Sequence, residues 1–102
     1  MYVHVHIRVV PLGVGTSISD YVAEAVKVLK ELGYDPLIES GGTAIQLENL
    51  EEIGKIVRII HQRLIKMGVQ RILTYISIDH RLNKTRSITD KINVVKTKLR
   101  KL

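Results

Sequence analysis

Two short stretches of this sequence carry residue types that suit a small polar ligand. The loop at residues 12–17 contains two glycines and ends in Thr16 and Ser17, directly before a helical pattern. Backbone N–H groups at a helix N-terminus have no partner within the helix, so with hydroxyl groups beside them they hold anions and hydrogen-bond acceptors. The second stretch, Gly42–Thr43 with a further glycine before it, adds a hydroxyl and a backbone that a ligand can approach closely.

The expected order of strands brings these two stretches together. When the first and second strands run parallel with the third between them, the loop after the first strand lies at the same end as the turn joining the other two. Thr16 and Ser17 are therefore expected beside Gly42 and Thr43. Composition and spacing alone favour a plainer interpretation, in which Ser17 only caps a helix, the glycines only make a turn and Thr43 only starts a strand.

The elements that position these residues follow from the hydrophobic spacing. Alternation of apolar and polar residues predicts strands at Val3–Val9, ended by Pro11 and the glycine after it, and at Arg71–Ile78. Three helices are predicted from apolar stripes at Ile18, Val22, Ala25, Leu29 and Leu32, at Ile53, Ile56, Val57, Ile60 and Leu64, and at Ile88, Ile92, Val95 and Leu99.

Turn and capping residues complete this prediction. Ser17 and Asn49 are expected as the N-caps of the first two helices. Short strands at Pro36–Ser40 and Thr43–Leu47 flank Gly41–Gly42, which predicts a tight hairpin. The resulting order is βαββαβ followed by a helix. It predicts an α+β, ferredoxin-like, split-βαβ fold, with an antiparallel sheet and two helices on one face.

The remaining sheet face is expected to meet water or a partner. No linker or internal repeat divides the chain, so a single domain over residues 1–102 is expected. Mixed aromatic, aliphatic and charged residues make the free face a plausible interface, and self-association through it or through the sheet edges is expected. By alternation this face carries Tyr2, His4, His6, Arg8, Leu37, Glu39, Ala44, Gln46, Leu73, Tyr75 and Ser77.

Composition limits the classes of protein to which the chain belongs. Its 102 residues, 45% apolar and 25% charged, suit one modest core. No apolar run is long enough to span a bilayer, and the first six residues lack the pattern of a signal peptide, so a cytoplasmic location is expected. The sequence contains no cysteine, which excludes disulfides and thiolate chemistry.

The net charge of +6 is concentrated at one end of the chain. Residues 1–80 contain 8 basic and 9 acidic side chains, whereas residues 81–102 contain 8 basic side chains and Asp90. A solvated helix face explains this basic segment better than a nucleic-acid site does. The alternative, an interaction protein whose basic C-terminus contacts RNA or another polyanion, stays open.

Metal binding and catalysis find little support in the sequence. His4 and His6 share a strand face, but no third ligand is fixed, since His61 lies on a helix and His80 follows the last strand. No serine lies in a Gly-x-Ser-x-Gly motif, and no Gly-x-x-x-x-Arg phosphate loop of the acylphosphatase kind follows the first strand. A protein that is not an enzyme and needs no cofactor is therefore expected.

The sequence resembles the family of small thiamine-binding proteins, which have about a hundred residues. The resemblance extends over nearly the whole chain, and its segments follow one another in the same order and at similar spacing. Those segments are Val10-Pro11-Leu12-Gly13, Thr16-Ser17-Ile18-Ser19, Tyr21-Val22-Ala23, Gly42-Thr43, Arg71-Ile72-Leu73-Thr74, Ile76-Ser77-Ile78-Asp79 with Arg81, and Asp90-Lys91-Ile92.

The resemblance implies homodimers or homotetramers of ferredoxin-like subunits that bind thiamine or its hydroxymethylpyrimidine part without turnover. Carried over residue by residue, it implies ligand contacts from Thr16, Ser17, Gly42 and Thr43, and from Gln46, where the family usually has glutamate. Glutamine keeps the hydrogen-bonding ability and loses the charge that would favour the cationic thiazolium.

A second departure from the family pattern lies in the turn before the threonine. Gly41 stands where the family usually has methionine. The positive end of the first helix suits pyrimidine acceptors or a phosphate better than a thiazolium cation. A related pyrimidine or a phosphorylated form of thiamine is therefore an alternative ligand.

Overall fold

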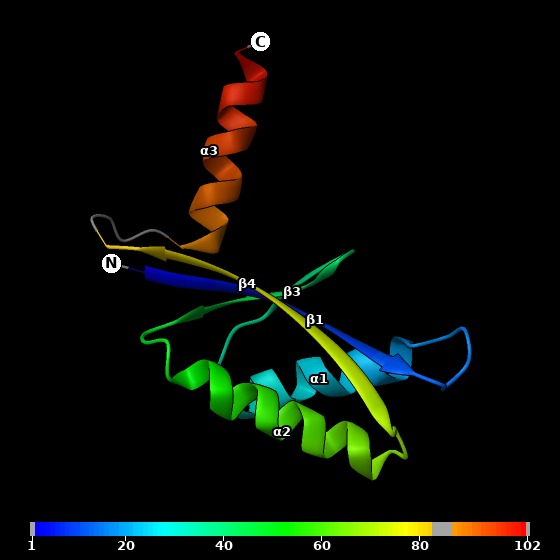
Figure 1. Cartoon of the computed structure of the whole chain (residues 1–102). Helices are drawn as coiled ribbons and strands as arrows, with labels where there is room; N and C mark the ends of the chain where they lie inside the picture. The colour runs from blue at the N-terminus through cyan, green and yellow to red at the C-terminus, as the bar shows by residue number, and fades with distance from the viewer. Residues whose placement is uncertain (1, 83–86, 102) are drawn as a thin grey trace.

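The computed structural model describes residues 2–82 and 87–101. Its four strands form one sheet in the order β2-β3-β1-β4, in which neighbours run antiparallel. Figure 1 shows α1 and α2 side by side on one face of this sheet and α3 on the other side. The predicted ferredoxin-like βαββαβ fold with an added C-terminal helix is confirmed. The elements are β1 (Tyr2–Leu12), α1 (Ser19–Glu31), β2 (Leu37–Glu39), β3 (Gly42–Leu47), α2 (Glu52–Lys66), β4 (Arg71–Arg81) and α3 (Ile88–Arg100).

The hydrophobic core lies between the sheet and the pair α1 and α2. Val3, Val5 and Ile7, which alternate along β1, are almost fully buried in it. Burying a large aliphatic side chain stabilises the fold by about 2 kcal/mol, so this layer holds both helices against the sheet. The helices contribute Ala25, Val28 and Leu29 from α1 and Ile56, Ile60 and Leu64 from α2, all except Val28 on the predicted stripes.

Both N-caps predicted for these two helices are wrong. The N-cap of α1 is Ile18, without a side-chain hydrogen bond, and not Ser17. The N-cap of α2 is Glu51 and not Asn49. Glu52 reaches back instead, and its carboxylate accepts hydrogen bonds from two backbone amides that precede the helix. The carboxylate of the first residue of α2 therefore gives a hydrogen-bond partner to two backbone amides that lie before the helix.

Strand ends also differ from the expectation. β1 continues through Pro11, which lies beyond Ile7, the last β1 residue that pairs with β3. Proline is tolerated there because β1 has a neighbouring strand on one side only. In the predicted hairpin, Glu39 pairs with Gly42, so the two-residue turn begins one residue earlier than the Gly41–Gly42 turn expected from the sequence.

The helix α3 projects from the sheet instead of packing along it (Figure 1). Ser87 and Asp90 form a reciprocal capping box at its start. Its first turn touches the sheet face opposite α1 and α2, where the Lys91 ammonium lies 4.8 Å from the centre of the Tyr2 ring. No α3 residue is buried. None of the described helices is long and apolar enough to cross a membrane.

Candidate functional site

A small hollow lies between the start of α1 and the β2–β3 turn, and we call it the α1 hollow. It encloses about 100 Å³, which is roughly the volume of three water molecules. Its lining comes from four parts of the chain that are distant in sequence. These are Ile7–Val9 of β1, Ile18, Val22, Ala25 and Leu29 at and within α1, Glu39–Thr43 at the turn, and Ile60 of α2.

The floor of the α1 hollow is apolar and its mouth is charged. Leu29 and Ile60 are almost fully buried at the floor, and the buried Thr43 adds a hydroxyl-bearing side chain to the lining. Arg8 and Glu39 are exposed, so a cation and an anion both lie at the opening. An apolar floor with a few convergent polar groups is the usual make-up of a small-molecule site.

Glu39 and Arg8 each have a partner that fixes their position. The Nε2 atom of His6 lies 3.3 Å from a carboxylate oxygen of Glu39. The Arg8 guanidinium lies 5.5 Å from the centre of the Tyr75 ring, within the range of a cation–π contact. His6 and Tyr75 belong to the sheet face opposite the core, so this face supports the mouth of the α1 hollow.

Gly42 packs so closely that no other residue fits in its place. A Cβ atom there would lie 2.6 Å from His6 Cε1 and 2.6 Å from the backbone oxygen of Ile7. Its φ of +154° is also a backbone conformation that L-residues rarely adopt. The turn therefore sits directly against β1, which brings the neighbouring Thr43 to the hollow.

The structure brings only part of the sequence-predicted site together. Gly42 and Thr43 line the α1 hollow beside the first residues of α1, as the topology suggested. Thr16 and Ser17 are exposed in the loop before α1 and do not belong to that lining. Gln46 lies elsewhere, because residues three apart on a strand point to opposite faces of a sheet.

Gln46 lines a second, larger space, which we call the acidic cavity. This cavity encloses about 570 Å³ between the α1–β2 connection, the end of β3 and the starts of α2 and α3. Three carboxylate residues, Asp35, Glu48 and Glu52, contribute to its wall. On the α3 side its wall is formed by Ser87, Ile88 and Thr89.

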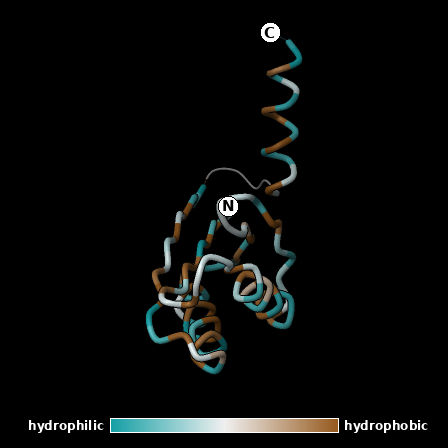
Figure 2. Tube along the Cα trace, turned by 90° about the vertical axis from the view of Figure 1, so that its right-hand side faces the viewer, coloured by the Kyte–Doolittle hydropathy of each residue, from teal (hydrophilic) through white to brown (hydrophobic). Residues whose placement is uncertain are grey.

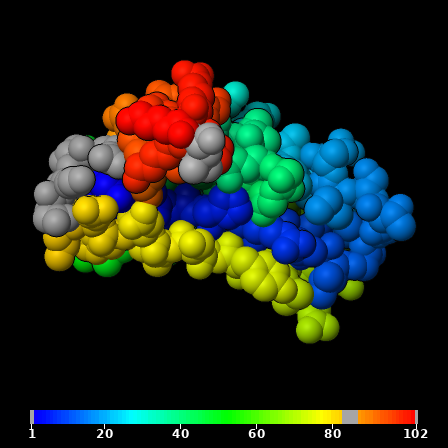
Figure 3. Space-filling model, turned by 90° about the horizontal axis from the view of Figure 1, so that it is seen from above, coloured from blue at the N-terminus to red at the C-terminus, as the bar shows by residue number. Residues whose placement is uncertain are grey.

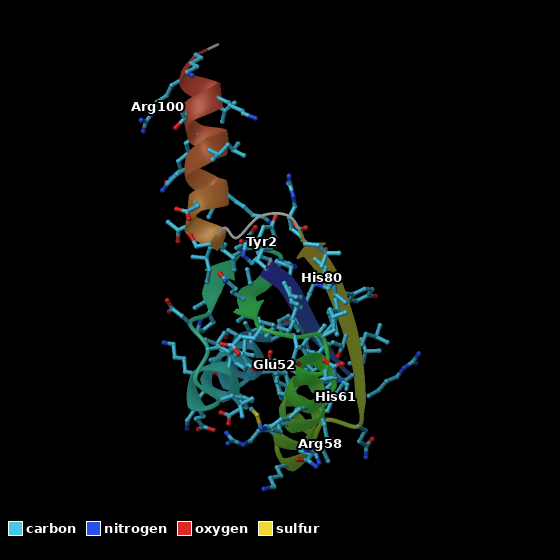
Figure 4. All side chains as sticks on the ribbon, turned by 90° about the vertical axis from the view of Figure 1, so that its left-hand side faces the viewer. Tyr2, Glu52, Arg58, His61, His80 and Arg100 are labelled. Atoms are coloured by element: carbon cyan, nitrogen blue, oxygen red, sulfur yellow. The ribbon has the colours of Figure 1, made fainter. Side chains whose placement is uncertain are left out.

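A hydrogen-bond cluster organises the acidic cavity around Glu52, which Figure 4 labels at the start of α2. The Tyr34 hydroxyl donates to one oxygen of Glu52 at 2.6 Å, and the amides of Glu48 and Asn49 donate to the other at 3.0 and 2.9 Å. The Tyr34 hydrogen bond and then the Asn49 amide lower the pKa of Glu52. Burial, and then the hydrogen bond to Glu52, raise the pKa of Tyr34 to about 12. Glu52 is thus held as a carboxylate beside a protonated tyrosine.

The sequence profile of the family described as "Thiamine-binding protein" matches residues 5–96 of this chain. The chain belongs to the thiamine-binding protein family. A UPF0045 protein of Methanothermobacter thermautotrophicus is 37% identical over 94 residues, which cover 91% of this chain and 95% of the relative. UPF0045 protein MJ1052 of Methanocaldococcus jannaschii is 32% identical over 90 residues, which cover 87% of each chain.

Solved structures share the fold of this family member. The crystal structure of hypothetical protein MJ1052 has a TM-score of 0.82 at 28% identity, and the match covers 93% of this chain and 96% of that one. The crystal structure of TM0486 from Thermotoga maritima, described as a candidate thiamine biosynthesis/salvage protein, has a TM-score of 0.75 at 21% identity and covers 93% and 99%. At 21% identity the second match shows the fold alone.

Two of the four histidines of this thiamine-binding protein family member, His4 and His6, lie on the sheet face opposite the core. His4 is buried and stacks on Tyr2, with ring centres 4.2 Å apart. His4 and His6 line a shallow hollow of about 260 Å³ together with Asp79 and Lys91, and the latter two form an ion pair. The hydrogen bond from Lys91 lowers the pKa of Asp79. Within residues 2–82 and 87–101, no group of three or more histidine, aspartate or glutamate side chains is arranged to hold a metal.

Sequence reasoning missed two residues at the mouth of the α1 hollow. Arg8 and Glu39 were expected on the free face of the sheet, and they reach the hollow because β1 runs past the β2–β3 turn there. Only the strand register, which the sequence does not define, shows that both residues border this hollow.

Proposed function

We propose that this protein binds thiamine or a related pyrimidine, such as hydroxymethylpyrimidine or a thiamine phosphate, without chemical turnover, in thiamine salvage, transport or sensing. The observation that carries the proposal is the α1 hollow, which has an apolar floor, a threonine and a charged mouth in a member of this family. The hollow holds residues from the Gly42–Thr43 turn that the family resemblance implicates.

The volume of the α1 hollow favours entry of one ring at a time. About 100 Å³ accommodates a flat heteroaromatic ring better than a whole thiamine molecule. The pyrimidine ring can pack its faces against Ile18 and Val22, while the Thr43 side chain and the turn backbone offer hydrogen bonds. The remainder of the ligand then lies at the mouth.

In this proposal, Glu39 supplies the negative charge that favours the cationic thiazolium at the mouth of the α1 hollow. The family resemblance assigns this charge to a glutamate, and in this chain Gln46 occupies that position and faces the acidic cavity. Glu39 lies at the mouth of the α1 hollow instead. Arg8, on the same opening, suits the phosphates of thiamine phosphate or pyrophosphate, since guanidinium groups pair well with phosphate oxygens.

Titration calorimetry with thiamine and with neutral hydroxymethylpyrimidine tests this proposal. We expect both to bind, and we expect Glu39→Gln to weaken thiamine binding about fivefold, as the loss of one exposed charge pair of about 1 kcal/mol suggests. Binding of hydroxymethylpyrimidine should stay unchanged in this variant, because that ligand carries no thiazolium. Absence of heat with both compounds and with thiamine phosphate would remove the proposal.

Self-association as a homodimer or homotetramer is part of the proposal. It is supported by the long, unpaired outer edge of β4 and by exposed apolar side chains on β4 and α3, which include Tyr75, Ile78 and Leu99. Sedimentation of the full chain at several concentrations measures this directly.

A further inference from the structure

The second half of α3 presents an apolar stripe that its own subunit does not cover. Ile88, Ile92, Val95 and Leu99 recur at intervals of four, three and four residues, which places them along one side of the helix. Ile88 and Ile92 contact the shallow hollow around His4. Val95 and Leu99 are 56% and 61% exposed. A helix of 13 residues is only marginally stable in water by itself, so this half of α3 gains from a packing partner.

Basic side chains flank the stripe on both sides. With a rotation of about 100° per residue, Lys91 and Lys98 lie along one margin of the stripe and Lys96 along the other. Lys96, Lys98, Arg100 and Lys101 follow one another without an acidic residue between them. Figure 2 shows hydrophobic and hydrophilic residues alternating along this projecting helix, and Figure 4 shows Arg100 near its outer end. The partner surface should therefore be apolar with acidic margins.

One surface of the protein has this complementary character, namely the β2 edge of the sheet. Residues 35–52 contain five carboxylates and no basic side chain. Within this segment Leu37, Ile38 and Leu50 are 37%, 63% and 42% exposed. β2 is also an edge strand, with β3 as its only neighbour in the sheet. We call residues 35–52 the acidic edge.

The second half of α3 does not reach the acidic edge of its own subunit. Only Ser87, Ile88 and Thr89, at the start of the helix, border the acidic cavity. From there the helix leads away from the sheet, as Figure 1 shows, and Figure 3 shows its outer end (red) from above. The α3 helix therefore leaves Val95 and Leu99 uncovered by its own subunit.

We propose that the second half of α3 docks on the acidic edge of a second copy of this chain, and that the partner's α3 docks reciprocally. Val95 and Leu99 then cover Leu37 and Ile38, with lysines of the helix beside carboxylates of the edge. A reciprocal, two-fold arrangement uses each contact twice, which brings the buried area toward the roughly 1,200 Å² of a stable interface. This interface specifies the surface for the proposed self-association, and its test requires no ligand.

Measuring the mass in solution of the Val95→Asp variant and of a matched control variant tests the docking surface. Val95→Asp places a carboxylate in the stripe, whereas Thr97→Asp adds the same charge about 160° around the helix from Val95. In light scattering or sedimentation, Val95→Asp should lose the oligomer and Thr97→Asp should keep it, with unchanged circular dichroism for both. An oligomer that survives Val95→Asp would overturn this surface only. A wild-type chain that stays monomeric would overturn self-association as well.

Cysteine cross-linking tests which surface α3 meets, because the chain has no cysteine of its own. A mixture of Leu99→Cys and Ile38→Cys proteins should form disulfide-linked heterodimers on mild oxidation, and neither protein alone should do so to the same extent. Efficient linkage of Leu99→Cys with itself would show that α3 pairs with another α3, and it would overturn the proposal. RNA binding that depends on Lys96 and Lys98 would also overturn the proposal, if Val95→Asp leaves the mass of the protein in solution unchanged.

Discussion

At the residue scale, Gly42 joins the turn, the α1 hollow and the opposite sheet face. A side chain at this position meets both the backbone of Ile7 and the ring of His6. His6 in turn contacts Glu39, so a displacement at Gly42 moves the carboxylate at the mouth of the hollow. If the proposed site binds its ligand, stability and ligand binding are therefore coupled at this glycine.

Gly42→Ala should destabilise the protein by about 1–3 kcal/mol, because backbone overlap and a strained φ add up. Gly41→Ala is the matched control, since a Cβ there meets nothing within 4 Å and its φ is not positive. Urea unfolding of both variants measures the difference. Equal unfolding midpoints for the two would contradict the close packing at Gly42.

The sequence predicts the residues of the turn better than those of the mouth. Glycine and threonine determine the backbone conformation close to their own position. Gly42 and Thr43 could therefore be recognised from turn chemistry alone. Arg8 and Glu39 meet only through the strand register, and a one-residue shift would reverse which face each occupies. Gln46 follows the same alternation, which places it in the acidic cavity.

At the element scale, the Tyr34–Glu52 cluster fastens the connection before β2 to the start of α2. Three hydrogen bonds converge on the carboxylate of Glu52, which is the first residue of α2. A negative charge in the first turn is favoured by the helix dipole as well. Asn49 does not cap α2 because the helix begins only at Glu52, and the Glu52 carboxylate instead accepts a hydrogen bond from the Asn49 amide.

Glu52→Gln should lower the free energy of unfolding by about 1 kcal/mol at pH 7, since charged hydrogen-bond acceptors are stronger than neutral ones. The pKa of Glu52 is lowered in the folded state from its ordinary value of 4.5. Its contribution is therefore fully present above pH 4.5 and is lost as the pH falls through the folded pKa. Urea unfolding between pH 3 and 7 should show the wild type and variant converging in acid. A constant difference across that range would contradict this role of the carboxylate.

At the scale of the whole molecule, the sheet separates two kinds of surface. One face holds the core and the α1 hollow, and the other carries His4, His6 and α3. Hydrophobic periodicity predicts the core face and the three helices, because each depends on spacing along one segment. It does not predict the direction of α3, because spacing within one helix does not define how that helix sits relative to the sheet.

Chemical-shift mapping of the ¹⁵N-labelled protein during addition of thiamine tests the central claim most directly, since it locates the ligand. The proposed site predicts that the amide signals of Ile18, Glu39, Gly41, Gly42 and Thr43 move together and saturate with a single affinity. Shifts confined to Tyr34, Gln46 and Glu48 would place the ligand in the acidic cavity and contradict the α1 hollow as the thiamine site.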